Sequence, residues 1–231
     1  TLNQGIENTQ YTHNHFMTAE GGDNQNSGLL NDLKSTVVAA SNQAFGPEAQ
    51  DVLRQQASHI LSSIDRIAAT TRFGDRQLLN GASGFAAPSL PPEVTYFRTD
   101  QANPQGNQNT ITIEVTGNGA DRQVSVNGTA AVLQDGLYQV TGKDWNGALA
   151  LAQDAAPGTY SVTIQGQGLS LKATGEPGEG GNFGFSSLAA GELGSSSGRG
   201  ALDSILRGGA NDFTSNPSGA MEVIDAASRE V

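Results

Sequence analysis

The chain has 231 residues and a formal net charge of −11 at pH 7, because 23 acidic residues outnumber 12 lysines and arginines. The few basic residues are scattered, which argues against nucleic-acid binding, since phosphate contacts need clustered cations. Hydrophobic residues make up 36% of the chain and aromatic residues 6%, both low for a globular enzyme. The absence of cysteine excludes disulfides, thiolate metal sites and cysteine catalysis, and no apolar run is long enough to predict a membrane span.

The pattern of residues 1 to about 73 predicts two helices. The first is expected to run from Leu2 towards Val38, and its middle, Gly21–Gly28, contains glycines that each cost a helix interior about 1 kcal/mol. We therefore expect a kink or a break there. The apolar positions of this helix are Leu2, Ile6, Phe16, Met17, Leu29, Leu30, Leu33 and Val37.

The second helix is predicted to begin at Gly46-Pro47-Glu48, because proline suits the first helical position and glutamate suits the positive end of the helix dipole. The connection Ser41–Gly46 is short, so the two helices should be antiparallel neighbours. The apolar residues of the second helix recur at helical period and are Val52, Leu53, Ala57, Ile60, Leu61, Ile64 and Ile67.

The end of this second helix is the most informative stretch of the chain, and residues 62–81 read SSIDRIAATTRFGDRQLLNG. Thr70 and Thr71 are β-branched and weaken the helix, and the Phe-Gly-Asp sequence at 73–75 then breaks it in a turn. Two leucines follow and Asn80-Gly81 closes the segment. The pattern predicts a helix that is followed, at a fixed distance, by a short extended piece.

Residues from about 85 to 187 read as an antiparallel β-domain, in the form of a small sandwich. Three segments alternate apolar and polar side chains with period two, namely Thr110–Val115, Gln123–Val126 and Tyr160–Ile164. Turns are expected at Asn118-Gly119, Asn127-Gly128, Asp135-Gly136 and Pro157-Gly158. We also expect one or two helical turns across Lys143–Asp154, which contains Trp145, and a flexible loop across Gly175–Gly181.

Helical segments are predicted again from Ser195 to Val231, and the last of them is expected to begin at Asn216-Pro217. The predicted fold class is α+β: an elongated antiparallel helical bundle, built from the N- and C-terminal segments, with an inserted antiparallel β-domain. In this order the two ends of the chain pack together. The expected domains are residues 1–84, an N-terminal helical hairpin; residues 85–187, the β-rich insertion; and residues 188–231, a return segment followed by the start of a C-terminal helix.

Residues 62–81 resemble the bacterial flagellin signature, in which an Ile-Asp-Arg-Ile/Val helix end is followed by Thr, then Phe-Asn-Gly, then Leu-Leu-Asp/Asn-Gly. Weaker similarities to the same family occur in the right order outside the β-domain, and together they cover about half of the chain. They lie at Leu2–Asn8, Thr18–Gly21, Ser41-Asn42, Gly208–Phe213 and Asn216–Ala226.

The resemblance implies a filament subunit, because flagellins bundle their terminal helices into a filament core and display a variable β-domain outside. It implies a homo-polymer with other flagellin subunits, motility as the function, and an extracellular location on the flagellum after export without a cleaved signal peptide. Further implied partners are the hook-associated junction and cap proteins and the flagellar export chaperone. The outermost terminal helices of the family, which bind that chaperone, have no counterpart here, so we expect a fragment that polymerises poorly alone.

Six residues are candidates for self-assembly contacts. Arg54, Asp65 and Arg66 lie on the polar side of the second helix, where a solvated helix face is the alternative interpretation. Phe73, Leu78 and Leu79 are explained first by packing beneath the turn, and the resemblance implies in addition that they cap the helical bundle.

Three further positions concern the flagellin-sensing Toll-like receptor. In recognised family members its epitope has an arginine on the exposed face of the first long helix, a leucine one turn on, and an acidic residue in the second helix. The matching positions here are Asp32, Thr36 and Gln56. Because aspartate in place of arginine reverses a charge, we expect this chain not to bind the receptor.

No enzyme is predicted, because the chain lacks a Gly-x-Ser-x-Gly elbow and a His-Glu-x-x-His motif, and no cofactor is expected. A metal site is not expected either, since His13 and His15 lack a third ligand. One alternative function is the hook–filament junction protein, although Arg72–Gly81 follows the filament pattern. A secreted adhesin or glycan-binding module is less well supported, because its aromatic residues are spread out: Tyr96, Phe97, Tyr138, Trp145 and Tyr160.

Overall fold

The computed structural model of the chain describes residues 2–41, 46–87, 89–102, 110–142, 145–166, 168–171 and 181–231. Contacts divide the chain into two compact units. The β unit consists of Thr1–Thr18 and Gly81–Ser186, and the helical unit consists of Ala19–Asn80 and Ser187–Val231. The domain boundaries expected from the sequence, at residues 84 and 187, stay predictions. Over the described residues, no helix combines the length and the apolar character that a membrane crossing requires.

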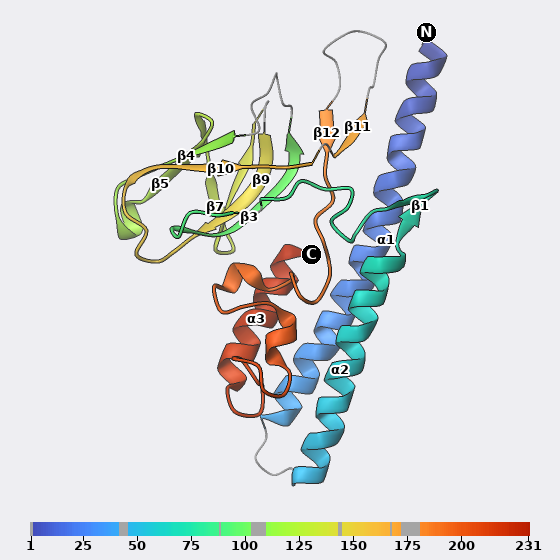
Figure 1. The fold of residues 1–231 in the computed structure, drawn as a ribbon, viewed down its shortest axis with the longest axis vertical. Helices are drawn as coiled ribbons and strands as arrows, with labels where there is room; N and C mark the ends of the chain where they lie inside the picture. Colours follow the sequence, from blue (N-terminus) through green and yellow to red (C-terminus); the bar gives the residue numbers. More distant parts are fainter. Residues whose placement is uncertain are drawn as a thin grey trace. The chain divides into compact units, whose positions relative to one another are not determined.

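Helix α1 (Leu2–Ala40) is continuous through Gly21–Gly28, so the expected kink or break does not occur (Figure 1). Part of the reason lies at Gly22, where a side-chain carbon would collide with Leu79 and would lie 3.1 Å from the hydroxyl oxygen of Thr71. The glycine lets α1 approach the end of the next helix closely, and the resulting packing offsets some of its poor helix propensity.

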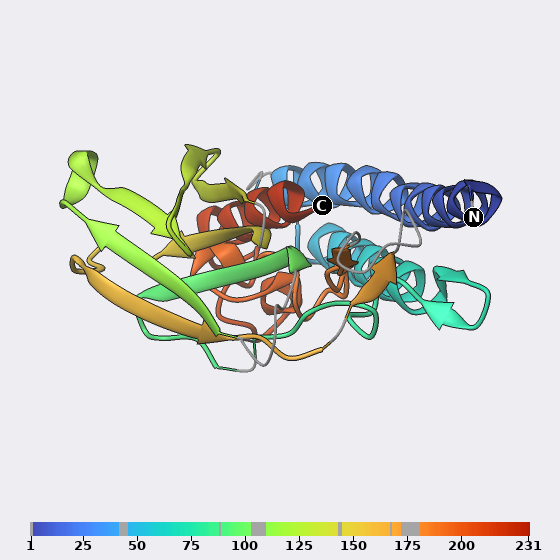
Figure 2. The same ribbon diagram turned by 90° about the horizontal axis from the view of Figure 1, so that it is seen from above.

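Helix α2 (Pro47–Thr70) begins at the proline, as predicted, and Figures 1 and 2 show it antiparallel beside α1. It is followed by a hairpin of strands β1 (Arg72–Phe73) and β2 (Arg76–Gln77). Gly74 allows the tight turn with a φ of 60°. Residues 42–45 of the expected α1–α2 connection lie outside the described residues. The buried apolar side chains of the pair are Ala19, Leu30, Leu33, Val37, Ala40, Ala57, Ile60, Leu61, Ile64 and Ala68.

The C-terminal segment completes the core of the helical unit. It contains two 3-10 turns, η2 (Ser195–Ser197) and η3 (Leu202–Ile205), and helix α3 (Pro217–Glu230). The Asn216 side chain caps α3 by accepting a hydrogen bond from the Gly219 N–H at 3.1 Å. Residues 19–80 and 187–231 therefore fold together, as predicted for the two ends, whereas residues 1–18 group with the β unit. The segment buries Leu188, Leu193, Leu202, Ile205, Phe213, Ala220, Val223, Ile224, Ala226 and Ala227.

The β unit contains two antiparallel sheets. One has the strand order β10-β4-β5-β6 and the other has the order β11-β12-β3-β9-β8-β7. Their inner faces share one apolar core, which includes Ile113 and Val162 from the first sheet and Val94 and Leu149 from the second. The predicted sandwich is therefore present. The strands are β3 (Val94–Ala102), β4 (Thr110–Thr116), β5 (Gln123–Val126), β6 (Thr129–Ala130), β7 (Val132–Gln134), β8 (Leu137–Thr141), β9 (Trp145–Leu151), β10 (Gly158–Thr163), β11 (Leu169–Leu171) and β12 (Gly181–Phe183).

The helical turns predicted across Lys143–Asp154 are wrong, because β9 runs through this stretch between β3 and β8. Glycine, alanine and leucine do not favour a strand, but β9 is buried along most of its length, and ladder hydrogen bonds on both sides override local propensity. The Trp145 indole N–H donates to the Thr99 hydroxyl at 3.1 Å, and its ring stacks on Phe97.

Two of the predicted turns are tight hairpins in which both central residues have positive φ. Asn127-Gly128 joins β5 to β6 with φ values of 48° and 77°, and Asp135-Gly136 joins β7 to β8 with 52° and 83°. Of the other predicted turns, Gly119 opens a short 3-10 turn, η1 (Gly119–Asp121), whereas Gly158 is already the first residue of β10. Of the expected loop Gly175–Gly181, all but Gly181 lies outside the described residues.

The first turns of α1 belong to the β unit, where Phe16 contacts two aromatic rings. Its centroid lies 5.7 Å from that of Phe183 and 5.4 Å from that of Phe185, both in edge-on geometry. Several apolar residues that the sequence assigns to this helix are nevertheless largely exposed: Ile6 at 50%, Phe16 at 40% and Met17 at 54%. This part of α1 is therefore only partly covered within the chain.

The last turn of α3 is fixed by a buried carboxylate. Glu230 is only 5% exposed, and its two oxygens accept hydrogen bonds from the Gly194 N–H at 2.6 Å and the Ser196 N–H at 2.8 Å. These backbone donors lie at the start of η2, where a negative charge is favourable. Glu230 thus ties the C-terminal helix to the return segment.

We predict that Glu230→Ala lowers the free energy of unfolding by about 2–4 kcal/mol, because two backbone donors lose a charged partner. Chemical denaturation followed by circular dichroism measures the change. The control is Arg229→Ala, which removes an exposed neighbour in the same turn and should have almost no effect. Equal losses in the two variants would show that the carboxylate contacts do not stabilise the fold.

Candidate functional site

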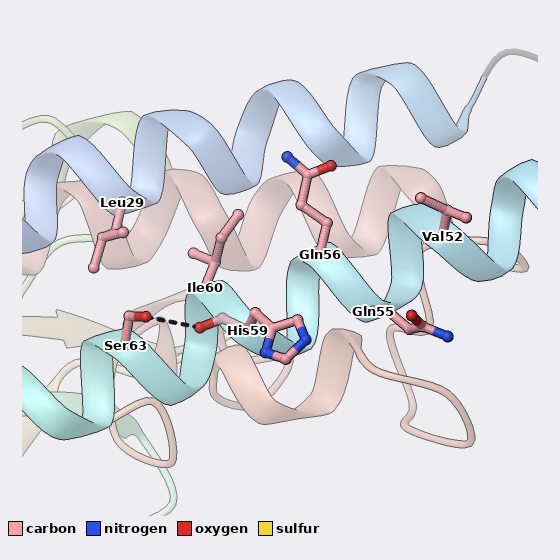
Figure 3. Close-up of a pocket in the computed structure, with 7 residues that line it drawn as sticks. All are labelled: Leu29, Val52, Gln55, Gln56, His59, Ile60 and Ser63. Atoms are coloured by element: carbon pink, nitrogen blue, oxygen red, sulfur yellow. Dashed lines mark hydrogen bonds between the residues drawn. The ribbon is translucent and has the colours of Figure 1, made fainter.

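A shallow groove of about 400 Å³ lies on the helical unit between α1 and α2 (Figure 3). Leu29 comes from α1 and the other lining residues come from α2. Val52 is 62% exposed, which is unusual for a residue in an apolar stripe. The lining residues are Leu29, Val52, Gln55, Gln56, His59, Ile60 and Ser63.

The stripe that the sequence predicts for α2 therefore does not continue into the core at Val52. Ala57, Ile60, Leu61 and Ile64 are buried, as expected. Val52 instead faces solvent, near the start of α2. An uncovered apolar side chain beside a groove is a surface that a partner can bury.

A second groove, of about 500 Å³, lies between α2 and the return segment, and it is cationic. Its arginines are Arg54 on α2 and Arg207 just after η3, and Asp51 is its single acidic residue. Arg207 is exposed. The lining residues are Asp51, Arg54, Gln55, Ser58, Leu206 and Arg207.

Arg54 is held in this groove by two contacts. Its guanidinium donates to the Asp51 carboxylate at 2.9 Å and to the Thr214 hydroxyl at 2.6 Å. Thr214 in turn donates to Asp212 through its hydroxyl at 2.7 Å and through its backbone N–H at 3.0 Å. This series of hydrogen bonds from Arg54 through Thr214 to Asp212 holds the return segment against α2. The Arg54 guanidinium still lines the groove.

Gln55 lines both grooves, so they form one continuous surface, which we name the α2 strip. One half of the strip is apolar, around Val52 and Ile60, and the other half is cationic, around Arg54 and Arg207. A ligand that matches it would combine an apolar side chain with a carboxylate.

The structure brings one of the six predicted assembly residues, Arg54, into the strip. Asp65 accepts a hydrogen bond from the Ala190 N–H at 2.8 Å and so binds the return segment of its own chain. Arg66 is exposed, and Phe73 is half-buried in β1. Leu78 and Leu79 are buried at 0% and 2% exposure, so their side chains already pack within the chain.

The three receptor-epitope positions differ in exposure. Gln56 is exposed and lines the apolar half of the strip, and Asp32 is exposed one helical turn from Leu29. Thr36, in contrast, is only 3% exposed, and its hydroxyl donates to the Asp32 carbonyl at 2.8 Å. Thr36 therefore offers little surface for a receptor contact, and the role of these positions stays a prediction.

Sequence reasoning missed most of the strip. Leu29 and Val52 are apolar positions of their helices in the sequence, and no sequence signal marks His59 or Arg207 as surface residues. Arg207 lies 153 residues after Arg54 in the sequence. The two line one groove only because the return segment packs on α2.

The contacts to Asp212 make the stability of the return segment depend on pH. Partial burial alone would raise the pKa of Asp212, but hydrogen bonds from the Thr214 hydroxyl, the Thr214 N–H and the Gly208 N–H, together with the charge of Arg54, lower it overall. A carboxyl group with a lowered folded-state pKa contributes stability above its unfolded-state pKa of about 3.9, and this is lost as the pH falls through the folded-state value.

We therefore predict that Asp212→Asn lowers the melting temperature at pH 6 and that the difference from wild type shrinks as the pH falls below 4. Thermal unfolding by circular dichroism between pH 2 and pH 7 measures this. Asp203→Asn, at an exposed position in η3, serves as the control. A difference for Asp212→Asn that is constant over the whole pH range would contradict the assignment.

Comparison with known proteins finds similarity in the N-terminal part of the chain. Residues 1–83 match the family model for the bacterial flagellin N-terminal helical region. The chain is 33% identical over 70 residues to polar flagellin C of Vibrio parahaemolyticus, which covers 30% of this chain and 18% of that protein. It is 31% identical over 81 residues to a flagellin of Clostridium tyrobutyricum, which covers 35% of this chain and 22% of that protein. The chain thus matches only about a fifth of the length of these relatives.

Two solved structures are similar over most of the chain. FliC from Burkholderia pseudomallei has a TM-score of 0.36 at 15% identity, over 91% of this chain and 90% of that one. FlgL from Xanthomonas campestris has a TM-score of 0.41 at 12% identity, over 99% of this chain and 86% of that one. Residues 1–83 are thus similar to the N-terminal helical region of bacterial flagellins.

Proposed function

We propose that the chain is a structural subunit of the bacterial flagellar filament and self-assembles through its helical unit. The β unit is then the variable, surface-exposed region. The similarity of residues 1–83 to the flagellin N-terminal region supports the proposal, and the observation that carries it is the α2 strip, where Val52 is 62% exposed. In this role the protein is structural and not an enzyme, serves motility, and lies outside the cell after export without a cleaved signal peptide.

The occupant of the α2 strip is a second copy of the chain. Charge complementarity supports this choice, because the strip is cationic around Arg54 and Arg207 whereas the chain as a whole carries a net charge of −11. A neighbouring copy can therefore supply a carboxylate, because acidic residues outnumber basic ones 23 to 12. Val52 and Leu29 provide the apolar area that such a contact would bury.

Further partners follow from the family alone. The hook-associated junction and cap proteins would contact the ends of the filament. The export chaperone would bind the terminal helices of the family. These partners are proposals, and no contact within the described residues points to one of them in particular.

The hook–filament junction protein is the alternative function. The discriminating observation is genetic: deletion of the parent gene should abolish filaments if it encodes the main subunit, and should leave detached filaments if it encodes the junction. An adhesin is disfavoured, because Trp145 is 2% exposed and stacks on Phe97 inside the sandwich instead of facing a ligand.

We predict that Val52→Glu and Arg207→Glu, each introduced into the full-length protein, raise the critical concentration for polymerisation about tenfold. The loss of one buried valine contact, or of one charge pair at an interface, corresponds to roughly this factor. Sedimentation of polymer, with electron microscopy of the pellet, measures the effect.

The matched controls are Val132→Glu, at an equally exposed valine on β7, and Arg229→Glu, at an exposed arginine on α3. Both should polymerise like wild type. If all four variants behave alike while wild type forms filaments, the chain is a filament subunit but the α2 strip is not its contact. If wild type forms no filaments, the proposed function itself is wrong.

We also infer that the protein evades the flagellin-sensing Toll-like receptor. Asp32 exposes a carboxylate where recognised flagellins have an arginine, and Thr36 is buried. A reporter-cell assay should therefore show at least tenfold weaker activation than a sensed flagellin, and Asp32→Arg should recover part of it. Activation equal to that of a sensed flagellin would refute the inference.

A further inference from the structure

Asn26 is a polar residue in the apolar core of the helical unit, and it is fully buried at 0% exposure. Neither its amide nitrogen nor its amide oxygen has a hydrogen-bond partner in the structure. Asn26 lies in the buried stripe of α1, one turn after Gly22 and one turn before Leu30. A buried amide without partners suffers the full desolvation penalty, so an apolar residue would be more favourable here.

The facing part of α2 offers the amide no partner. Gly22 lies against Thr71 at the end of α2, and Leu29 lines a groove together with Ile60. In an antiparallel pair, Asn26 lies between these two levels, where the buried side chains of α2 are Ile64 and Ala68. The packing around Asn26 is therefore apolar.

Two glycines weaken the same segment of α1 without a packing reason. Gly21 and Gly28 are both inside the helix, and a side-chain carbon added at either would meet nothing within 4 Å. Alanine would fit and would favour the helix at both positions. Gly22 differs, because its missing side chain permits the contact with Leu79.

The following part of α1 shows none of these features. From Leu30 to Ala40 there is no glycine, and its stripe buries Leu30, Leu33 and Val37 at no more than 1% exposure. The boundary between the β unit and the helical unit falls between Thr18 and Ala19, just before the weakened segment.

We propose that residues 21–28 of α1 form a built-in hinge, a segment that opens locally while the remainder of the helix stays folded. Opening exposes the Asn26 amide to water, which satisfies its two groups, and releases the backbone of Gly21 and Gly28. The closed state is held mainly by the close contact of Gly22 with the end of α2. This inference does not depend on the proposed function.

Hydrogen exchange of the backbone amides, measured by mass spectrometry on the 231-residue chain, tests the hinge. In the wild type, amides of residues 22–28 should exchange at least tenfold faster than those of residues 31–37. The double variant Gly21→Ala/Gly28→Ala should slow exchange in the segment by about fivefold per glycine, the ratio that corresponds to ~1 kcal/mol. Asn26→Leu should slow it at least fivefold.

The control is Asn31→Ala, an exposed substitution in α1 outside the segment, which should leave exchange at residues 22–28 unchanged. Circular dichroism verifies that each variant folds, and the alanine variant tests the hinge even if Asn26→Leu repacks the core. Cleavage before Asp23 by a protease specific for aspartate should fall in parallel. Equal protection of residues 22–28 and 31–37 in the wild type, or no slowing in the alanine variant, would overturn the proposal.

Discussion

The structure depends on the burial of an apolar stripe that α1 and α2 share but cannot cover alone. Leu33, Val37 and Ile64 are fully buried in the unit that the helical pair forms with the return segment and α3. Each fully buried aliphatic side chain contributes about 1.5–3 kcal/mol, so the stripe is the main reason why residues 19–80 and 187–231 come together. Polar contacts then fix the arrangement: Lys34 pairs with Asp225 at 2.6 Å, and Glu230 binds the backbone at the start of η2. The exposed Lys34 pair adds little energy but is specific in geometry.

The elements with strong local signals could be predicted from the sequence. Pro47 and Asn216-Pro217 mark helix starts that the structure confirms, and the Asn-Gly and Asp-Gly pairs at 127 and 135 mark tight hairpins. The prediction failed where tertiary packing overrides propensity. Trp145–Leu151 is a strand because it pairs with β3 and β8 on its two sides. Helix α1 stays helical across Gly21–Gly28 in part because Gly22 packs closely against Leu79.

The candidate site was less predictable than the fold, because it consists of what the core leaves uncovered. A periodic apolar pattern shows which face of a helix is apolar, but it does not show where the covering segment ends. Val52 belongs to the apolar stripe of α2 in the sequence and yet faces solvent. Arg207 lines the strip from an irregular segment after η3, where the sequence has no periodic pattern. Leu78 and Leu79 show the reverse: the family motif marks them, but they are buried within the chain. A motif therefore points to packing within the chain as readily as to a contact between subunits.

The central claim is that the helical core closes on itself, separately from the core of the β sandwich. Trp145 is the only tryptophan and lies in the sandwich, so its fluorescence follows the β unit, while circular dichroism at 222 nm follows the helices. The most direct measurement is denaturant unfolding of Ile64→Ala with both probes. We expect the dichroism transition to shift by about 2–5 kcal/mol of unfolding free energy and the fluorescence transition to stay in place. Equal shifts of both transitions would mean that the chain has one cooperative core and would contradict this account.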